Sequence, residues 1–171
     1  NARAAIPPNR FLVAHHTVID PTSALYELNG RPGTIPAISI EPGIAKVAPA
    51  LRDALGSVGG APAAMASALA RQRANILAVI GALHRAGVPI VAGTDQAGPG
   101  HSLHREMELY VEAGFTPLEA IQAATSVPAR VMGLLNETGT VEAGKRADLL
   151  VLDGDPLADI RNTRKVWLVV A

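Results

Sequence analysis

The residues with the clearest capacity for chemistry lie in one glycine-rich stretch, Val88-Pro-Ile-Val-Ala-Gly-Thr-Asp-Gln-Ala-Gly-Pro-Gly100. A short apolar run ends at Gly93, and the loop that follows carries one carboxylate, Asp95, with His101 and His104 just beyond it. Carboxylate and imidazole are ligand types of zinc and other transition metals. A metal-bound carboxylate can also accept a proton from an attacking water. The pattern predicts that Asp95 binds a metal and moves a proton.

The two histidines after the loop are spaced i, i+3 at the start of an expected helix, so they can share one helical face. We expect His104 and His101 to contact a substrate or to support the metal site. The alternative is a helix entry with one exposed and one packed histidine. Glu106 and Glu108 in the same helix are expected to be solvated or ion-paired rather than catalytic.

The remaining histidines favour structural roles. His15 and His16 precede a short expected strand, which places them at the end opposite the site if the sheet is parallel. His84 lies near the end of a long expected helix and is assigned to packing.

Two other readings of the Asp95 loop fit less well. The loop lacks the glycine spacing of the dinucleotide fingerprint and the Lys-Ser/Thr of a P-loop, and Asp95 would repel a phosphate. No serine stands in a G-x-S-x-G pattern, so a serine hydrolase is unsupported.

The elements that must hold Asp95 read as an alternating α/β fold. A long amphipathic helix is predicted over Pro62–Ala86, with Gly87 as its stop, and a buried strand follows over Val88–Ala92. Thr17–Thr22 is expected to form another short strand. An acid at the carboxyl end of a buried strand is where α/β folds build their sites.

The rest of the chain is predicted to be mostly helical, with β structure near its end. Before the long helix we expect one or two helical turns over Asn9–His16 with Asn9 as N-cap, a helical turn or loop over Ser23–Leu28, an irregular excursion over Asn29–Pro49 and a brief helix over Leu51–Leu55. After the Asp95 loop we expect helices over Leu103–Ala113, over Pro117–Ala124, where a capping box at Thr116 and Glu119 opens the helix, and from Ser126 to near Gly133. Strands are expected over Thr140–Asp153 and Lys165–Ala171.

The length and composition fit one domain of ordinary size with a sizeable core. The chain has 171 residues, 49% of them hydrophobic but only 3% aromatic, which predicts a core of Ala, Val, Leu and Ile. Its formal net charge is zero, so overall charge directs it neither to nucleic acid nor to an anionic membrane. Cysteine is absent, and no apolar run reaches the roughly 18 residues of a membrane span. Compartment stays open, with the cytoplasm slightly favoured.

Four stretches together are similar to one known family. They are Val88–Asp95, Ser102–Glu106, Glu112–Thr125 and Gly139–Asp153. This pattern resembles the amidohydrolase superfamily, with the imidazolonepropionase-like and prolidase-like enzymes as its nearest branch. The similarity extends from about Thr17 to the end of the chain.

The resemblance implies a fold and a site. The family's fold is an α/β (β/α)₈ barrel of the TIM type, flanked by a small β-sandwich built from both chain ends. Thr17–Thr22 would be strand seven and Val88–Ala92 strand eight, so residues 1–135 would be the C-terminal portion of the barrel and residues 136–171 strands of the sandwich. Asp95 matches the family's strand-eight aspartate, which binds the metal and shuttles the proton. The implied cofactor is a divalent metal, zinc by preference, as one or two ions.

The departure from the family is large. Members carry a His-x-His on the first barrel strand and further ligands on middle strands, and this sequence contains no His-x-His. A complete barrel needs about 250 residues. We therefore expect a C-terminal piece of a longer hydrolase, which alone neither binds metal tightly nor turns over substrate.

Two functional hypotheses follow. In the first, the parent protein hydrolyses amide, cyclic amide or dipeptide-like C–N bonds with Asp95 as metal ligand and proton shuttle. In the second, the chain is a catalytically incomplete scaffold or interaction module. Exposed sheet edges and apolar helix faces would favour self-association, so the chain is expected to be able to form a homo-oligomer.

Overall fold

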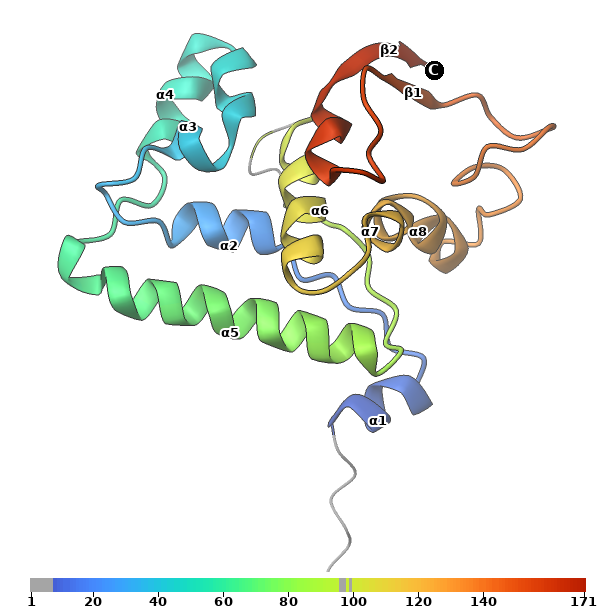
Figure 1. Ribbon diagram of the computed structural model, residues 1–171, viewed down its shortest axis with the longest axis horizontal. Helices are drawn as coiled ribbons and strands as arrows, with labels where there is room; N and C mark the ends of the chain where they lie inside the picture. Colours follow the sequence, from blue (N-terminus) through green and yellow to red (C-terminus); the bar gives the residue numbers. More distant parts are fainter. Residues whose placement is uncertain (1–7, 96–97, 99) are drawn as a thin grey trace, which may run out of the picture.

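The computed structural model describes residues 8–95, 98 and 100–171; Gln96, Ala97 and Pro99 of the predicted Asp95 loop lie outside the described residues. Helices dominate the described part, with one short hairpin near the C-terminus (Figure 1). The α-helices are α1 (Pro8–Ala14), α2 (Ser23–Asn29), α3 (Ala37–Ile40), α4 (Pro49–Ser57), α5 (Ala66–Arg85), α6 (Ser102–Glu112), α7 (Pro117–Ala124) and α8 (Ser126–Val131). The 3₁₀ turns are η1 (Pro42–Lys46), η2 (Ala63–Met65) and η3 (Ile160–Arg164), and the strands are β1 (Leu149–Leu152) and β2 (Val166–Val170).

Helix α5 is the long amphipathic helix that the sequence predicted, preceded by the separate turn η2. It ends at Arg85, and Gly87 follows two residues later with a φ of +77°, a left-handed conformation that glycine adopts without strain. Near its end Gly81 is buried, and a Cβ there would collide with the carbonyl oxygen of Ala113. The missing side chain therefore lets α5 approach the end of α6 closely.

The predicted start of α7 is confirmed in detail. Thr116 Oγ1 accepts a hydrogen bond from Glu119 N at 3.2 Å, and Glu119 Oε2 accepts one from Thr116 N at 2.8 Å. Two N–H groups that the helix cannot satisfy are thus paired reciprocally.

The two segments predicted as strands before and after α5 run parallel but pair only briefly. Ile19 N donates to Pro89 O and Val91 N donates to Ile19 O, both at 3.0 Å. Ile19 and Ile90 form an isolated parallel bridge rather than a named strand. Proline has no N–H, so Pro21 cannot extend the ladder on this side.

Strands β1 and β2 form an antiparallel hairpin, with Leu149 opposite Val170. The predicted strand over Thr140–Asp153 forms only in its last part, since the chain turns at Gly144, where φ is +91°. All five residues of β2 are exposed. The hairpin lies beside η3 in Figure 1, and apolar side chains on both of its faces are exposed.

The main core contains two of the chain's five aromatic residues. Tyr110 and Phe115 lie at its centre with Ile80, Ile90 and Met107. The expectation of a purely aliphatic core is therefore wrong, because one large ring fills space that several small alanine side chains leave.

The excursion after α2 is more regular than predicted. It folds into α3 and η1, and a second core cluster forms beneath it from Leu28, Ala37, Ile44 and Leu55. Burial of apolar side chains from three separate segments thus orders a stretch that looks irregular by local pattern alone. Among the described residues, no helix combines the length and apolar character needed to cross a bilayer.

Candidate active site

Asp95 lies exposed at the carboxyl end of the parallel pair. Its φ is +43°, a left-handed conformation that few non-glycine residues adopt, so the chain turns sharply where the carboxylate is presented. Two residues earlier, Gly93 N donates to Asp20 Oδ1 at 3.1 Å. The carboxylates of Asp20 and Asp95 therefore belong to adjacent strand ends.

Asp20 is a residue that the sequence reasoning did not single out. Its Oδ1 also accepts from Thr22 Oγ1 at 3.2 Å. A usable signal was present, because Asp20 is the acid at the end of a predicted strand, directly before Pro21. The same pattern drew attention to Asp95.

His101 lies at the N-terminal boundary of α6 and is partly buried. A Cβ added at Gly43 of η1 would collide with its side chain, so the ring packs against this turn. Gly98 of the Asp95 loop lies next to it: a Cβ there would be 4.0 Å from His101 Cβ.

His104 lies one turn further along α6 and faces the C-terminal segment. Its Nδ1 is 3.1 Å from Thr163 Oγ1. Burial, followed by the charge of Arg164, lowers the pKa of His104 below its ordinary value. The structure brings His101 and His104 together on α6, but within the part of the chain that it describes, no hydrogen bond joins either to Asp95.

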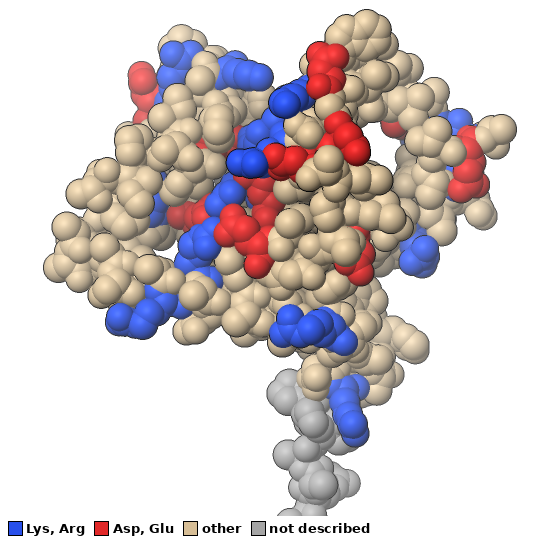
Figure 2. Space-filling view, viewed as in Figure 1, with Lys and Arg blue, Asp and Glu red and all other residues tan. Residues whose placement is uncertain are grey.

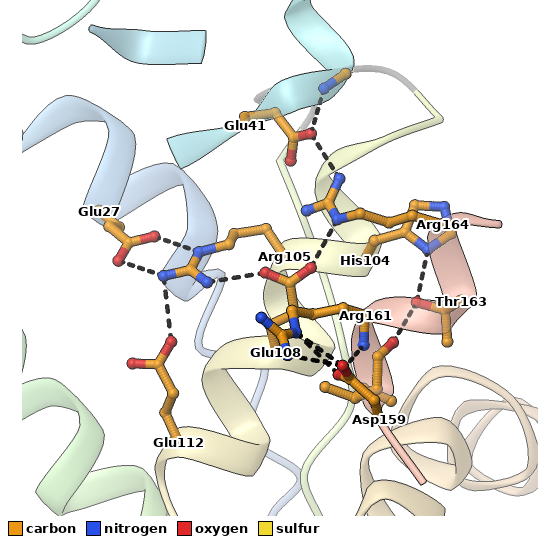
Figure 3. A network of polar contacts seen from close by, with 12 residues as sticks. Glu27, Glu41, His104, Arg105, Glu108, Glu112, Asp159, Arg161, Thr163 and Arg164 are labelled. Carbon is orange, nitrogen blue, oxygen red and sulfur yellow. Dashed lines mark hydrogen bonds and ion pairs between the residues drawn. The ribbon is translucent and has the colours of Figure 1, made fainter. Parts of the chain in front are cut away.

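A network of ion pairs surrounds α6 on the side shown in Figure 3. Arg105 contacts Glu27 of α2 through Nε and Nη2, at 2.7 and 2.8 Å, and Glu108 through Nη1 at 2.8 Å. Arg73 of α5 also binds Glu27, at 2.7 Å. Burial alone would raise the pKa of Glu27, but the two guanidinium groups hold it below its ordinary value.

The network continues to the C-terminal segment through Arg164. Its Nε donates to Glu108 Oε1 at 2.6 Å and its Nη1 to Glu41 Oε1 at 2.9 Å. Glu41 is buried beside η1 and also accepts from Gly43 N. Figure 2 shows alternating basic and acidic side chains crossing this face as a band. The expectation that Glu108 is ion-paired is confirmed.

Glu106 behaves differently from the expectation. Its side chain is 0% exposed, and no Lys, Arg or His among residues 8–95, 98 and 100–171 forms an ion pair with it. Its two oxygens accept from Ser23 N at 2.9 Å and Ala24 N at 2.6 Å. Burial raises the pKa of Glu106, and these two bonds oppose that shift. Glu106 therefore caps the first turn of α2 from another helix.

The other histidines have structural surroundings. The ring of His84 stacks on Phe115 with centroids 3.7 Å apart, and its Nε2 lies 3.5 Å from Glu119 Oε1. His15 packs against Phe11 at 4.2 Å between ring centroids. For His84 the structural assignment is confirmed.

The described residues supply one candidate metal ligand but not a complete site. Across residues 8–95, 98 and 100–171, no three His, Cys, Asp or Glu side chains are grouped closely enough to hold a metal ion. Protein zinc sites use three or four side-chain ligands. Within the described residues the exposed Asp95 carboxylate therefore has no such group of ligands around it.

Comparison with known proteins gives a consistent family. The model of the Amidohydrolase family matches residues 13–170. The chain is 44% identical over 79 residues to the ochratoxinase of Aspergillus niger, an alignment that covers 45% of this chain and 16% of that protein. It is 34% identical over 112 residues to the imidazolonepropionase of Agrobacterium fabrum, covering 63% of this chain and 26% of that protein.

The fold also matches solved structures. A Xaa-Pro dipeptidase with bound methionine superimposes with a TM-score of 0.65 at 23% identity, over 95% of this chain and 35% of the dipeptidase. This match and the mixed helices and strands confirm the α/β class. The chain spans 16% and 26% of the two curated relatives and about a third of the dipeptidase.

Proposed function

Because this chain belongs to the amidohydrolase family, we propose that it is the C-terminal part of a longer, metal-dependent hydrolase of carbon–nitrogen bonds. One observation carries the proposal most strongly. In a chain that the family model matches almost throughout, an exposed carboxylate, Asp95, stands at the carboxyl end of a parallel pair of segments. That is where α/β enzymes place reacting groups.

Asp95 has two roles in this proposal, as a metal ligand and as a proton shuttle. Amidohydrolases generally bind divalent metals, and one or two zinc ions, when bound, would polarise the substrate carbonyl and lower the pKa of a water. Asp95 would accept a proton from the attacking water and deliver it to the leaving nitrogen. Its exposure and its place in a glycine-rich loop support both roles.

His101 and His104 are proposed to contact the substrate. His101 lies beside Gly98 of the Asp95 loop, which supports a place at the rim of the site. Nδ1 of His104 is within hydrogen-bond distance of Thr163 Oγ1, so Nε2 is the nitrogen through which His104 would contact a substrate. The substrate is proposed to be a small molecule with an amide, cyclic amide or dipeptide-like bond, in keeping with the names of the relatives.

The barrel assignment belongs to the same proposal. Residues 1–135 would be the C-terminal portion of a (β/α)₈ barrel, with the Ile19 and Ile90 segments as strands seven and eight, and residues 136–171 would supply strands of a β-sandwich. A groove of about 530 Å³ between the Ile19 segment and α5, beside the 58% exposed Val79, supports this because an isolated domain rarely leaves such a face bare.

The test compares the 171-residue chain with the longer protein encoded by its gene. The longer protein should contain a His-x-His, bind zinc by elemental analysis and hydrolyse small amides. The short chain should do neither of the last two. Asp95→Asn in the longer protein should lower kcat by about 10²- to 10⁴-fold, the contribution of a positioned general acid–base group.

Asp159→Asn is a matched control, because Asp159 pairs with Arg161 in η3 and takes no part in the proposed site. Tight stoichiometric zinc on the short chain, or full activity of Asp95→Asn, would contradict the proposal. A gene with no His-x-His upstream would favour the alternative, a catalytically incomplete scaffold. The exposed hairpin β1–β2 gives that alternative a surface for a second copy of the chain.

A further inference from the structure

The parallel pair beneath Asp95 stops in an unusual way. In a parallel ladder a residue bonds through its N–H and C=O to two residues of the facing strand, as Ile19 does with Pro89 and Val91. The next residue in this register, Pro21, has no N–H to donate to the carbonyl oxygen of Val91. Backbone pairing therefore ends one step before the Asp95 loop.

Two side chains bond to the backbone groups of residues 91 and 93 that the parallel ladder leaves without a backbone partner. The hydroxyl of Tyr110 donates to Val91 O at 2.8 Å. The carboxylate of Asp20 accepts from Gly93 N at 3.1 Å. The strand end that leads to Asp95 is thus completed by a buried phenol and by an exposed carboxylate.

Packing at Gly93 shows where the Asp20 carboxylate lies. A Cβ added at Gly93 would collide with Cγ and both carboxylate oxygens of Asp20. Gly93 does not have a positive φ, so space rather than backbone conformation requires glycine there. The carboxylate therefore lies against the Cα of Gly93.

Capping of the next helix does not account for Asp20, whose local side-chain contact is the bond from Thr22 Oγ1 at 3.2 Å. Thr22 precedes α2 without a side-chain cap, and the free N–H groups of that helix, on Ser23 and Ala24, are taken by Glu106. Asp20 is therefore not needed to cap the helix that follows it. Its described backbone partner is Gly93, 73 residues later.

We propose that Asp20 is a positioning residue for Asp95. The left-handed conformation of Asp95 is strained for a residue other than glycine and persists only where neighbouring contacts hold the chain. The bond from Gly93 N to Asp20, together with that from Ala92 N to Ala123 O at 2.9 Å, fixes the backbone just before that turn. The inference rests on the proposed role of Asp95.

The test uses the longer enzyme with Asp20→Ala, Asp20→Asn, Gly93→Ala and the double variant Asp20→Ala/Gly93→Ala. Asp20→Ala should lower kcat by about 10- to 100-fold with KM little changed, since a misplaced reacting group costs rate rather than binding. Asp20→Asn keeps an acceptor oxygen and should restore kcat to within about threefold of wild type. Asp159→Ala also removes a bond from a backbone N–H to an exposed Asp, but within η3 and its cap rather than at the Asp95 loop, and it should leave kcat unchanged.

The double variant separates positioning from general damage. Gly93→Ala should lower kcat less in the Asp20→Ala background than in wild type, because the carboxylate that its Cβ meets is gone. Additive effects, or an unchanged kcat in Asp20→Ala, would overturn the inference.

Amide exchange of Gly93, followed by NMR, provides a readout without turnover. Asp20→Ala should accelerate exchange at Gly93 and not at Ala92, and equal exchange in wild type and variant would overturn the inference. Full activity of Asp95→Asn would instead overturn the proposed function, while the Gly93 exchange result would still report on the contact itself.

Discussion

The buried carboxylate of Glu106 permits a sharp test of how α2 is held. Its oxygens accept from two backbone donors, Ser23 N and Ala24 N, and its side chain is fully buried. Glu106→Gln keeps the shape but replaces one acceptor by an amide NH₂ that faces an N–H. One buried donor is then left without a partner.

The size of the effect follows from that count. An unpaired buried donor costs about 1–3 kcal/mol, so Glu106→Gln should lower the free energy of unfolding by about that amount. Glu106→Ala leaves both donors unpaired and also opens a cavity, so about 3–5 kcal/mol is expected. With an m-value of about 2 kcal/mol/M, the glutamine variant should unfold at roughly 1 M less urea.

The assay is urea unfolding of the 171-residue chain followed by far-UV circular dichroism. Glu137→Gln is the control, because the described contact of the Glu137 carboxylate is an exposed pair with Arg146 at 3.4 Å, which should contribute less than about 1 kcal/mol. If Glu106→Gln unfolds at the same urea concentration as Glu137→Gln, the capping argument is refuted. Amide exchange at Ser23 and Ala24 should also accelerate in the Glu106 variants only.

Three further predictions concern other contacts. Burial and Arg164 lower the pKa of His104, so the folded chain binds fewer protons than the unfolded chain and its stability should fall as pH drops below 6.5. The Tm of His104→Gln should depend less on pH below 6.5 than that of the wild type, and an equal pH dependence of the two Tm values would contradict the lowered pKa of His104. Arg105→Lys keeps the charge but loses the fork that holds Glu27 and should cost about 1–2 kcal/mol in urea unfolding, whereas no loss would mean that charge alone suffices. The hairpin variant Trp167→Lys/Val169→Lys removes side chains that are 66% and 63% exposed, and it should reduce self-association in sedimentation velocity; unchanged association would exclude this surface.

Local sequence signals predicted the parts of the fold that depend on local chemistry. The capping box at Thr116 and Glu119 and the stop at Gly87 appear as expected, because each needs only neighbours within one turn. The helix after Asp95 is also placed correctly to within one residue at each end.

Structure that depends on distant partners could not be predicted in this way. The Asn29–Pro49 excursion is ordered because its Ala37 and Ile44 are buried together with Leu28 and Leu55 at its two ends, a cluster that follows no helical or strand period. The strand signal at Thr17–Thr22 is real, but Pro21 and the few paired neighbours reduce it to a single bridge.

In the candidate site, too, residues marked by local sequence could be predicted and residues defined by distant contacts could not. Asp95 could be selected because strand, glycine and acid follow one another in the sequence. Asp20 and Glu106 could not be assigned roles, because each bonds to backbone 73 and 83 residues away. Asp20 shares with Asp95 the position of an acid at a predicted strand end, but neither its neighbours nor those of Glu106 in the sequence indicate which distant N–H groups the carboxylates bind.

The link between Arg164 and Glu41 has a consequence for how the chain is made. These residues lie 123 positions apart, and the Glu41 carboxylate is buried in the finished fold. At about 5–20 residues per second, a ribosome produces Arg164 roughly 6 to 25 seconds after Glu41. During that interval the acid beside η1 lacks this basic partner. The ion pair between Glu41 and Arg164 therefore cannot form before the C-terminal segment has been synthesised, however early the surrounding turn folds.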